Sequence, residues 1–240
     1  MADADIGSIP TRAKWFKENG YPFSEYTLRK LVKSGAIRAR YDLAVMCGLD
    51  VPEAKLENFS KTGSTFLIKR FDRDGEKRIH FASAMTLLGK DDDASAADGS
   101  SYLDIVSLIR KYGATPKKDL LELWKRIVFN MAVSNTDDHL RNHGFLLTNE
   151  GWRLSPLYDV NPNSEGDVLS LNVDEYNNLI DFDLALDVAP TFGLTEKQAK
   201  IHLDEIKSIV ENNWRILAKK YGLTRGEIER MSPAMKAYLT

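Results

Sequence analysis

The stretch SNTDDHLRNH, residues 134–143, places two aspartates, two asparagines, two histidines and one arginine in ten positions. It follows residues 120–133, which are mostly apolar and predict the end of a buried helix. Such polar groups are costly to remove from water. A buried helix that leads directly into so many of them therefore predicts a functional loop.

The spacing of the acidic and amide residues indicates the chemistry. Asn142 stands five positions after Asp137, a two-stranded hairpin turning at residues 149–151 follows, and Asp159 comes just past it. Phosphoryl transfer needs one carboxylate to accept the proton of the attacking hydroxyl. It also needs an amide and a second carboxylate that hold Mg²⁺ against the nucleotide phosphates. Protein kinases have the same spacing and order.

Other interpretations remain open for these residues. Asp137, Asn142 and Asp159 could each cap a helix or form a turn, as Asp and Asn often do. His139 and His143 lie four positions apart and could bind a metal on a helix, but no third ligand has a usable spacing. We expect His139 to brace the loop by a hydrogen bond, and His143 to be structural or exposed.

Three segments resemble the HipA family of serine/threonine kinases, which are toxins of bacterial toxin–antitoxin pairs. They are VFNMAVSNTDDHLRNHGFLL with GWRLSPLYDVNP, FLIKRFDRDGEKRIHF, and CGLDVPEAKL. The resemblance runs from about Tyr41 to the C-terminus, or about five-sixths of the chain. It implies an α+β, HipA-like protein-kinase fold with a mostly helical C-terminal lobe and small β-hairpins over residues 41–240.

The resemblance also implies roles for particular residues. Asp137 would be the catalytic base, assisted by His139, and Asn142 and Asp159 would bind Mg²⁺. The chain at residues 69–71 would be the hinge that holds the adenine of ATP, largely through its backbone. Lys69, Arg70 and Phe71 are therefore the candidate cofactor-binding residues, although Arg70 could instead form a structural ion pair and Phe71 could be core. The implied substrate is a protein of tRNA charging, and the implied partner is a helix-turn-helix antitoxin.

The sequence departs from the family before residue 41, where the phosphate loop and its lysine should stand. We identify neither of them and expect an incomplete N-terminal lobe. Residues 11–40 hold eight Lys/Arg against two Glu, a local charge of +6. Residues 9–38, around SEYTLRKLVKSGAI, resemble the helix-turn-helix of excisionase-like modules. Residues 1–40 are thus predicted as a basic helical segment that could bind DNA.

Three functional hypotheses follow from these features. The first is an active HipA-like kinase, and the second is a truncated pseudokinase that binds DNA or protein. The third is a small-molecule kinase of the aminoglycoside type, although its loop usually reads H-G-D. A gel shift that weakens steeply with salt would favour the second hypothesis.

The composition indicates the class of protein and its compartment. Hydrophobic residues make up 43% of the 240 residues and charged residues 28%, as in ordinary soluble proteins. The single cysteine, Cys47, excludes an internal disulfide framework and favours a reducing compartment. The first ten residues do not resemble a signal peptide, and no apolar run reaches the roughly 20 residues of a membrane span. We therefore expect a cytoplasmic protein without a membrane partner.

Overall fold

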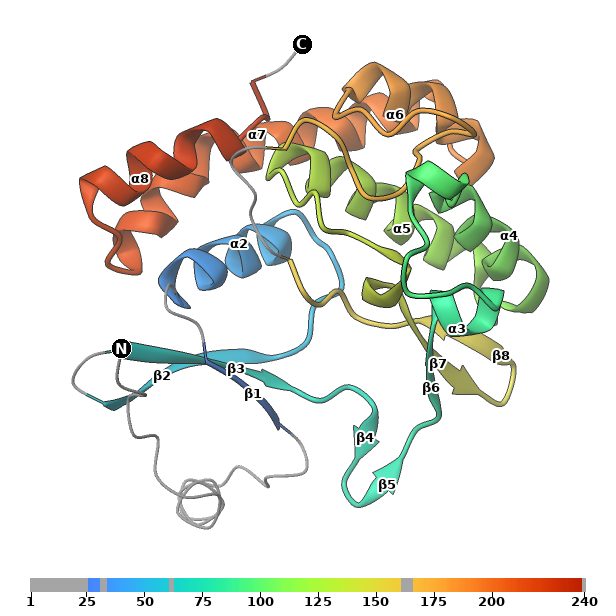
Figure 1. Ribbon diagram of the computed structural model, residues 1–240, viewed down its shortest axis with the longest axis horizontal. Coiled ribbons are helices and arrows are strands. Elements are labelled where there is room, and N and C mark those ends of the chain that lie inside the picture. Colours follow the sequence, from blue (N-terminus) through green and yellow to red (C-terminus); the bar gives the residue numbers. More distant parts are fainter. Residues whose placement is uncertain (1–25, 31–33, 61–62, 161–165, 239–240) are drawn as a thin grey trace.

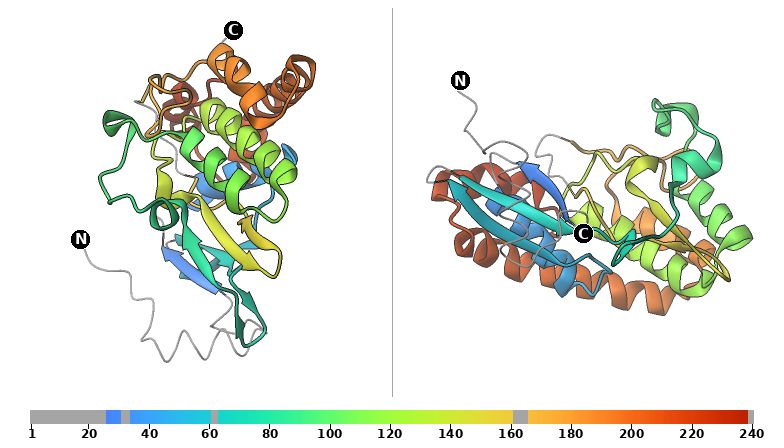
Figure 2. Two further views of the ribbon diagram at one scale, coloured as in Figure 1. Left: turned by 90° about the vertical axis from the view of Figure 1, so that its right-hand side faces the viewer. Right: turned by 90° about the horizontal axis from the view of Figure 1, so that it is seen from below.

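The computed structural model describes residues 26–30, 34–60, 63–160 and 166–238 (Figure 1). A small lobe made of a three-stranded sheet and one helix adjoins a larger, mostly helical lobe (Figures 1 and 2). The α+β architecture expected from the sequence, with a mostly helical C-terminal lobe, is confirmed. None of the helices in the described part of the chain has the length and apolar character needed to cross a membrane.

The small lobe is an antiparallel sheet with α2 (Ser34–Met46) packed against it. Its strands are β1 (Tyr26–Lys30), β2 (Ala54–Ser60) and β3 (Gly63–Lys69), in the order β1-β3-β2. Phe66 and Leu67 of β3 are fully buried, so the central strand carries the core of this lobe. Helix α2 also contacts α7 (Glu196–Lys220) of the large lobe and so links the two lobes.

The expected helix-turn-helix is wrong for its second helix. Residues 26–30 form β1 and pair with β3 from Tyr26↔Lys69 to Lys30↔Thr65. A strand partner thus overrides a helical pattern that short apolar spacings suggested, which is common for ambiguous segments. The first expected helix lies outside the described residues. The expected domain boundary between residues 40 and 41 falls inside α2.

Of the basic residues expected to face DNA, one is ion-paired and another is buried in the small lobe. Arg38 forms an ion pair with Asp42 at 2.9 Å and donates to the carbonyl of Ala54 at 2.5 Å. Arg40 is 1% exposed, and burial lowers its pKa to about 9. Arg38 and Arg40 therefore contribute little to a phosphate-binding surface.

The connection between the lobes contains a tight turn. The short strands β4 (Arg73–Asp74) and β5 (Lys77–Arg78) flank Gly75, whose φ of +57° suits glycine. Residues 64–69 do not pair across this turn. They belong to β3, which pairs with β1 and β2.

The large lobe is built around α5, whose side chains from Leu123 to Ala132 are almost all buried. The long C-terminal helix is α7, which begins after a capping box formed by Thr195 and Gln198. The predicted hairpin is confirmed as β7 and β8, which form a sheet in the order β6-β7-β8. The elements of this lobe are β6 (Phe81–Ser83), α3 (Ala84–Leu88), α4 (Tyr102–Tyr112), α5 (Pro116–Ala132), β7 (Gly144–Thr148), β8 (Gly151–Leu154), α6 (Phe182–Val188), α7 (Glu196–Lys220) and α8 (Arg225–Met231).

Truncation of Ile127 tests whether α5 is the centre of the core. Ile127 has no exposed surface, so Ile127→Ala should lower the free energy of unfolding by about 2–5 kcal/mol through lost burial and a cavity. Urea unfolding followed by circular dichroism measures this change. The exposed Lys117 on the first turn of the same helix provides the control, because Lys117→Ala should change stability by only about 0.5 kcal/mol. Equal effects of the two substitutions would contradict the core assignment.

Candidate active site

A buried carboxylate fixes the loop that follows α5. Asp138 is 1% exposed, and its Oδ2 accepts hydrogen bonds from the Tyr102 hydroxyl and from Nδ2 of Asn130, each at 2.7 Å. Nε2 of His143 lies 3.0 Å from the same oxygen and donates to it when protonated. Tyr102 comes from α4 and Asn130 from α5, so Asp138 ties the loop to two helices.

The net electrostatic effect of these contacts keeps Asp138 ionised. Burial alone would raise the pKa of its carboxyl, but His143, Tyr102 and His139 outweigh burial and lower that pKa below its ordinary value. The loop thus contains a stable buried negative charge. This answers why two adjacent aspartates follow a buried helix: Asp138 is an anchor, whereas Asp137 beside it is exposed.

The loop is also braced around Asp137 itself. Nδ2 of Asn142 donates to the backbone carbonyl of Asp137 at 3.0 Å, and the amide nitrogen of Asn142 donates to the carbonyl of His139 at 2.8 Å. Asn142 is 3% exposed and lies in a short 3₁₀ turn, Leu140–Asn142. The side chain of Asn142 therefore holds the position of Asp137, and the two predicted residues are brought together.

Asp159 lies on a segment that is attached to the same loop. The hydroxyl of Tyr158 donates to the carbonyl of Arg141 at 2.6 Å, one residue before Asn142. Asp159 has a φ of +60°, and Ser134, where the loop begins, has a φ of +47°. They are the two non-glycine residues with positive φ in the described chain. Backbone strain of this kind collects at functional sites.

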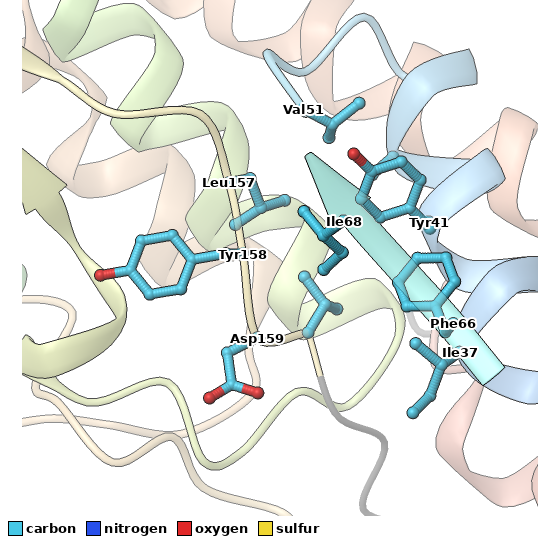
Figure 3. A pocket seen from close by; sticks show the side chains of 10 residues that line it. Ile37, Tyr41, Val51, Phe66, Ile68, Leu157, Tyr158 and Asp159 are labelled. Carbon is cyan, nitrogen blue, oxygen red and sulfur yellow. The ribbon is translucent and has the colours of Figure 1, made fainter. Parts of the chain in front are cut away.

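Two cavities lie where the lobes meet, on either side of Ile68 and Tyr158. One of about 260 Å³ is lined by the hinge residues 69–72 together with Phe81. The other, of about 100 Å³, is apolar and lies between α2, β3 and residues 157–160 (Figure 3). In Figure 3 the carboxyl group of Asp159 points away from the ring of Phe66. The hydroxyl of Tyr41 on the wall of this second cavity is buried and makes no hydrogen bond within the described structure.

Two of the three predicted hinge side chains are engaged in ion pairs. Arg70 binds Asp72 through two hydrogen bonds of 2.8 and 2.6 Å, and it lowers the pKa of that carboxyl. Lys69 lies 3.8 Å from Glu53. Both basic side chains are thus in ion pairs. Phe71, in contrast, contacts the rings of Phe81 and Tyr158 and forms an aromatic wall.

The two histidines have different surroundings. His143 is fully buried against Asp138 and packs edge-on to the ring of Tyr102 at 5.6 Å, which confirms its structural role. His139 is half-buried, and its Nδ1 makes no hydrogen bond within the described structure. The bracing hydrogen bond expected of His139 is therefore not made by this nitrogen. No group of three His, Cys, Asp or Glu residues among those described is arranged to hold a metal ion.

Sequence reasoning missed three residues of this site. Asp138 was hidden because adjacent aspartates cannot be told apart by spacing alone. Tyr102 and Tyr158 lie far from the loop in sequence, and only the fold brings their hydroxyl groups to it. Of the three, only Tyr158 could have been found from the sequence, because it directly precedes Asp159.

The geometry is matched by comparisons of the sequence with protein families. The family described as HipA-like C-terminal domain matches residues 37–214. The chain belongs to this family. Two curated relatives are "Putative kinase Y4mE" of Sinorhizobium fredii and a "Putative kinase" of Haemophilus influenzae. The first is 36% identical over 126 residues, which are 49% of this chain and 30% of that protein. The second is 31% identical over 123 residues, 47% of this chain and 36% of that protein. The chain thus matches about a third of the length of these relatives.

Two solved structures show the same fold. HipA of Shewanella oneidensis MR-1, solved with HipB and its operator DNA, superposes with a TM-score of 0.69 at 18% identity. The match covers 90% of this chain and 57% of that one. The Helicobacter pylori proinflammatory kinase CtkA superposes with a TM-score of 0.55 at 15% identity, over 90% of this chain and 93% of that one. At these identities the likeness concerns the fold alone.

Separate substitutions of the two adjacent aspartates test whether Asp138 is the anchor of the loop and Asp137 an exposed group. Asp138→Ala would leave three buried hydrogen-bonding groups without their shared acceptor, so it should lower the free energy of unfolding by about 3–5 kcal/mol. Asp137→Ala removes an exposed side chain and should change stability by about 0.5 kcal/mol. Chemical denaturation of both variants at neutral pH measures the difference. A larger loss for Asp137→Ala would overturn the assignment.

Proposed function

We propose that this protein is an ATP- and Mg²⁺-dependent serine/threonine protein kinase of the HipA type. The observation that carries the proposal is the attachment of two segments to one loop. Asn142 holds the backbone of Asp137, and Tyr158 holds the chain beside Asn142, directly before Asp159. Three oxygen-bearing side chains in the order of a kinase catalytic site thus come from segments that are bonded to each other.

The residues present fit a nucleotide. The hinge cavity has aromatic walls formed by Phe71, Phe81 and Tyr158, which suit a flat purine. The backbone at residues 69–71 would bind the adenine edge, since the Lys69 and Arg70 side chains are engaged elsewhere. The unpartnered Tyr41 hydroxyl, in the cavity beside Asp159, is a further group that a ligand could satisfy.

Within the site, each residue has a distinct task. Bound ATP with Mg²⁺ supplies the phosphoryl group and offsets the charge of its phosphates. Asp137 accepts the proton of the substrate hydroxyl. The Asn142 side-chain nitrogen donates to the Asp137 carbonyl, so the side-chain oxygen of Asn142 is the atom that would hold the metal ion, together with the carboxylate of Asp159. His139 would support Asp137 through the loop.

The family resemblance extends the proposal to a biological role. We propose that the protein is the toxin of a toxin–antitoxin pair and that it phosphorylates a protein of tRNA charging. The Shewanella HipA structure contains HipB and operator DNA. An antitoxin of helix-turn-helix type is accordingly the partner we propose for this chain.

The variant Asp137→Asn tests the proposed base. Removing a general base should lower the rate of phosphate transfer from labelled ATP to protein by about 10²–10⁴-fold, because the amide cannot accept the proton. The affinity for ATP·Mg²⁺, measured by calorimetry, should stay unchanged. Equal transfer by the two proteins would refute the role of Asp137. Nucleotide binding without any transfer to candidate partners would favour the pseudokinase.

The variant Asp159→Gly tests the proposed metal ligand. Glycine is chosen because alanine would add strain at a φ of +60°. ATP binding in the presence of Mg²⁺ should weaken by at least about tenfold, whereas thermal stability should hold or rise because strain is relieved. Calorimetric titrations of both proteins with and without Mg²⁺ give the comparison. An unchanged dependence on Mg²⁺ would remove Asp159 from the site.

A further inference from the structure

One long segment of the large lobe carries charge of a single sign. Residues 155–196 contain nine aspartates and glutamates and not one lysine or arginine. The segment includes Asp159, the hairpin at residues 167–180 and α6. A chain with 33 basic residues in 240 would ordinarily place several in such a length.

A second acidic segment packs against the first. Residues 91–109 contain five aspartates and no basic residue. The amide of Ala96 donates to the carbonyl of Ser170 at 2.7 Å, and the amide of Tyr102 donates to that of Asn172 at 2.9 Å. Nδ2 of Asn172 also donates to the carbonyl of Ala96 at 3.2 Å. The two acidic segments therefore lie side by side.

The first of these segments lies beside the proposed catalytic loop. The hydroxyl of Ser170 donates to the carbonyl of Thr136 at 2.7 Å, directly before Asp137. Gly166 approaches Thr136 so closely that an added Cβ would lie 2.7 Å from its methyl carbon. The hairpin at residues 167–180 is thus held against the site where a substrate hydroxyl would react.

The hairpin presents apolar side chains as well as charge. Val168 and Leu179 are paired across it and are 44% and 49% exposed, and Tyr176 at its turn is 87% exposed. Exposed apolar groups on a rigid, hydrogen-bonded hairpin are a common feature of protein-binding surfaces. Their acidic surroundings determine which partner would fit.

Few cations neutralise the surface. Lys236 binds Asp167 at 2.5 Å and Arg141 binds Asp92 at 2.8 Å, and Lys90 and Arg110 flank residues 91–109 in the sequence. The carboxylates of Asp91, Asp93 and Glu175 are exposed and form no ion pair with any described residue. The remaining negative potential repels nucleic acid and attracts a cationic partner.

We propose that this surface, formed by residues 91–109 and the hairpin at 167–180, binds the protein substrate of the kinase through a basic segment. The recognised segment carries lysines or arginines around its serine or threonine, together with an apolar side chain that contacts Val168 and Leu179. This substrate class rests on the proposed kinase activity. Binding of the basic segment itself does not require that activity.

Short synthetic peptides test the proposal on the full chain. One peptide has lysines on both sides of a single serine and one leucine, and in its matched partner glutamine replaces every lysine. Fluorescence anisotropy should show binding of the lysine peptide alone, weakening as salt increases. Phosphate transfer from ATP should likewise favour the lysine peptide.

Two variants of equal charge change provide the control. The surface variant combines Asp91→Asn, Asp93→Asn and Glu175→Gln, and the control variant combines Asp204→Asn, Glu211→Gln and Glu229→Gln on α7 and α8. Affinity for the lysine peptide should fall about tenfold in the surface variant and stay unchanged in the control. An added Leu179→Ser substitution should weaken binding of the lysine peptide further.

The outcomes distinguish this inference from the kinase proposal. Equal affinity for both peptides, or equal loss in both variants, overturns the docking surface even where ATP binding and transfer persist. Binding of the lysine peptide in a protein that transfers no phosphate supports the surface and refutes the kinase. Preferential binding of single-stranded nucleic acid that the surface variant alone abolishes would also overturn it.

Discussion

The buried carboxylate of Asp138 is the interaction on which the candidate site depends. Its Oδ2 collects donors from α4, from α5 and from His143 at the far end of the loop. A buried charge is costly unless it is paired and hydrogen-bonded, so one geometry of the loop is strongly favoured over others. The position of the neighbouring exposed residue, Asp137, is fixed by the same loop geometry. Asp138 thus holds the loop rigid, and Asp137, the residue before it, remains accessible.

The strain in the backbone is located at the two ends of the same arrangement. Ser134 lies where the loop begins, and Asp159 lies on the segment that Tyr158 attaches to the loop. Both residues have positive φ. Such conformations cost of order 1 kcal/mol for residues other than glycine. The buried network around Asp138 and the Tyr158–Arg141 hydrogen bond provide favourable interactions that can offset this cost. The strain directs the side chain of Asp159, which a relaxed strand or helix would direct elsewhere.

The sequence predicted the large lobe well because its signals are local. The apolar periodicity of α5, the capping box before α7 and the turn between β7 and β8 are each contained in a few neighbouring residues. The order Asp137, Asn142, Asp159 was also readable, as was the family. The structure confirms that Asn142 lies against Asp137, while the chemical roles of these residues stay predictions.

The small lobe was predicted poorly because its structure depends on distant partners. The segment YTLRK, residues 26–30, has no decisive periodicity, and its pairing with β3 makes it a strand. The predicted basic surface for DNA is affected by the same cause, because Arg38 forms an ion pair with Asp42 and Arg40 is buried. A count of basic residues along a sequence shows how many cations there are, but not which of them face solvent.

The distribution of charge imposes a constraint on any nucleotide bound between the lobes. The phosphates of ATP are anionic, and they would stand near Asp137, Asp159 and the acidic surface of residues 91–109 and 167–180. Like charges at these distances repel unless cations intervene. Mg²⁺ held by Asn142 and Asp159 would meet part of this requirement. A cationic segment of the substrate would supply the remainder, so nucleotide and substrate should each strengthen the binding of the other.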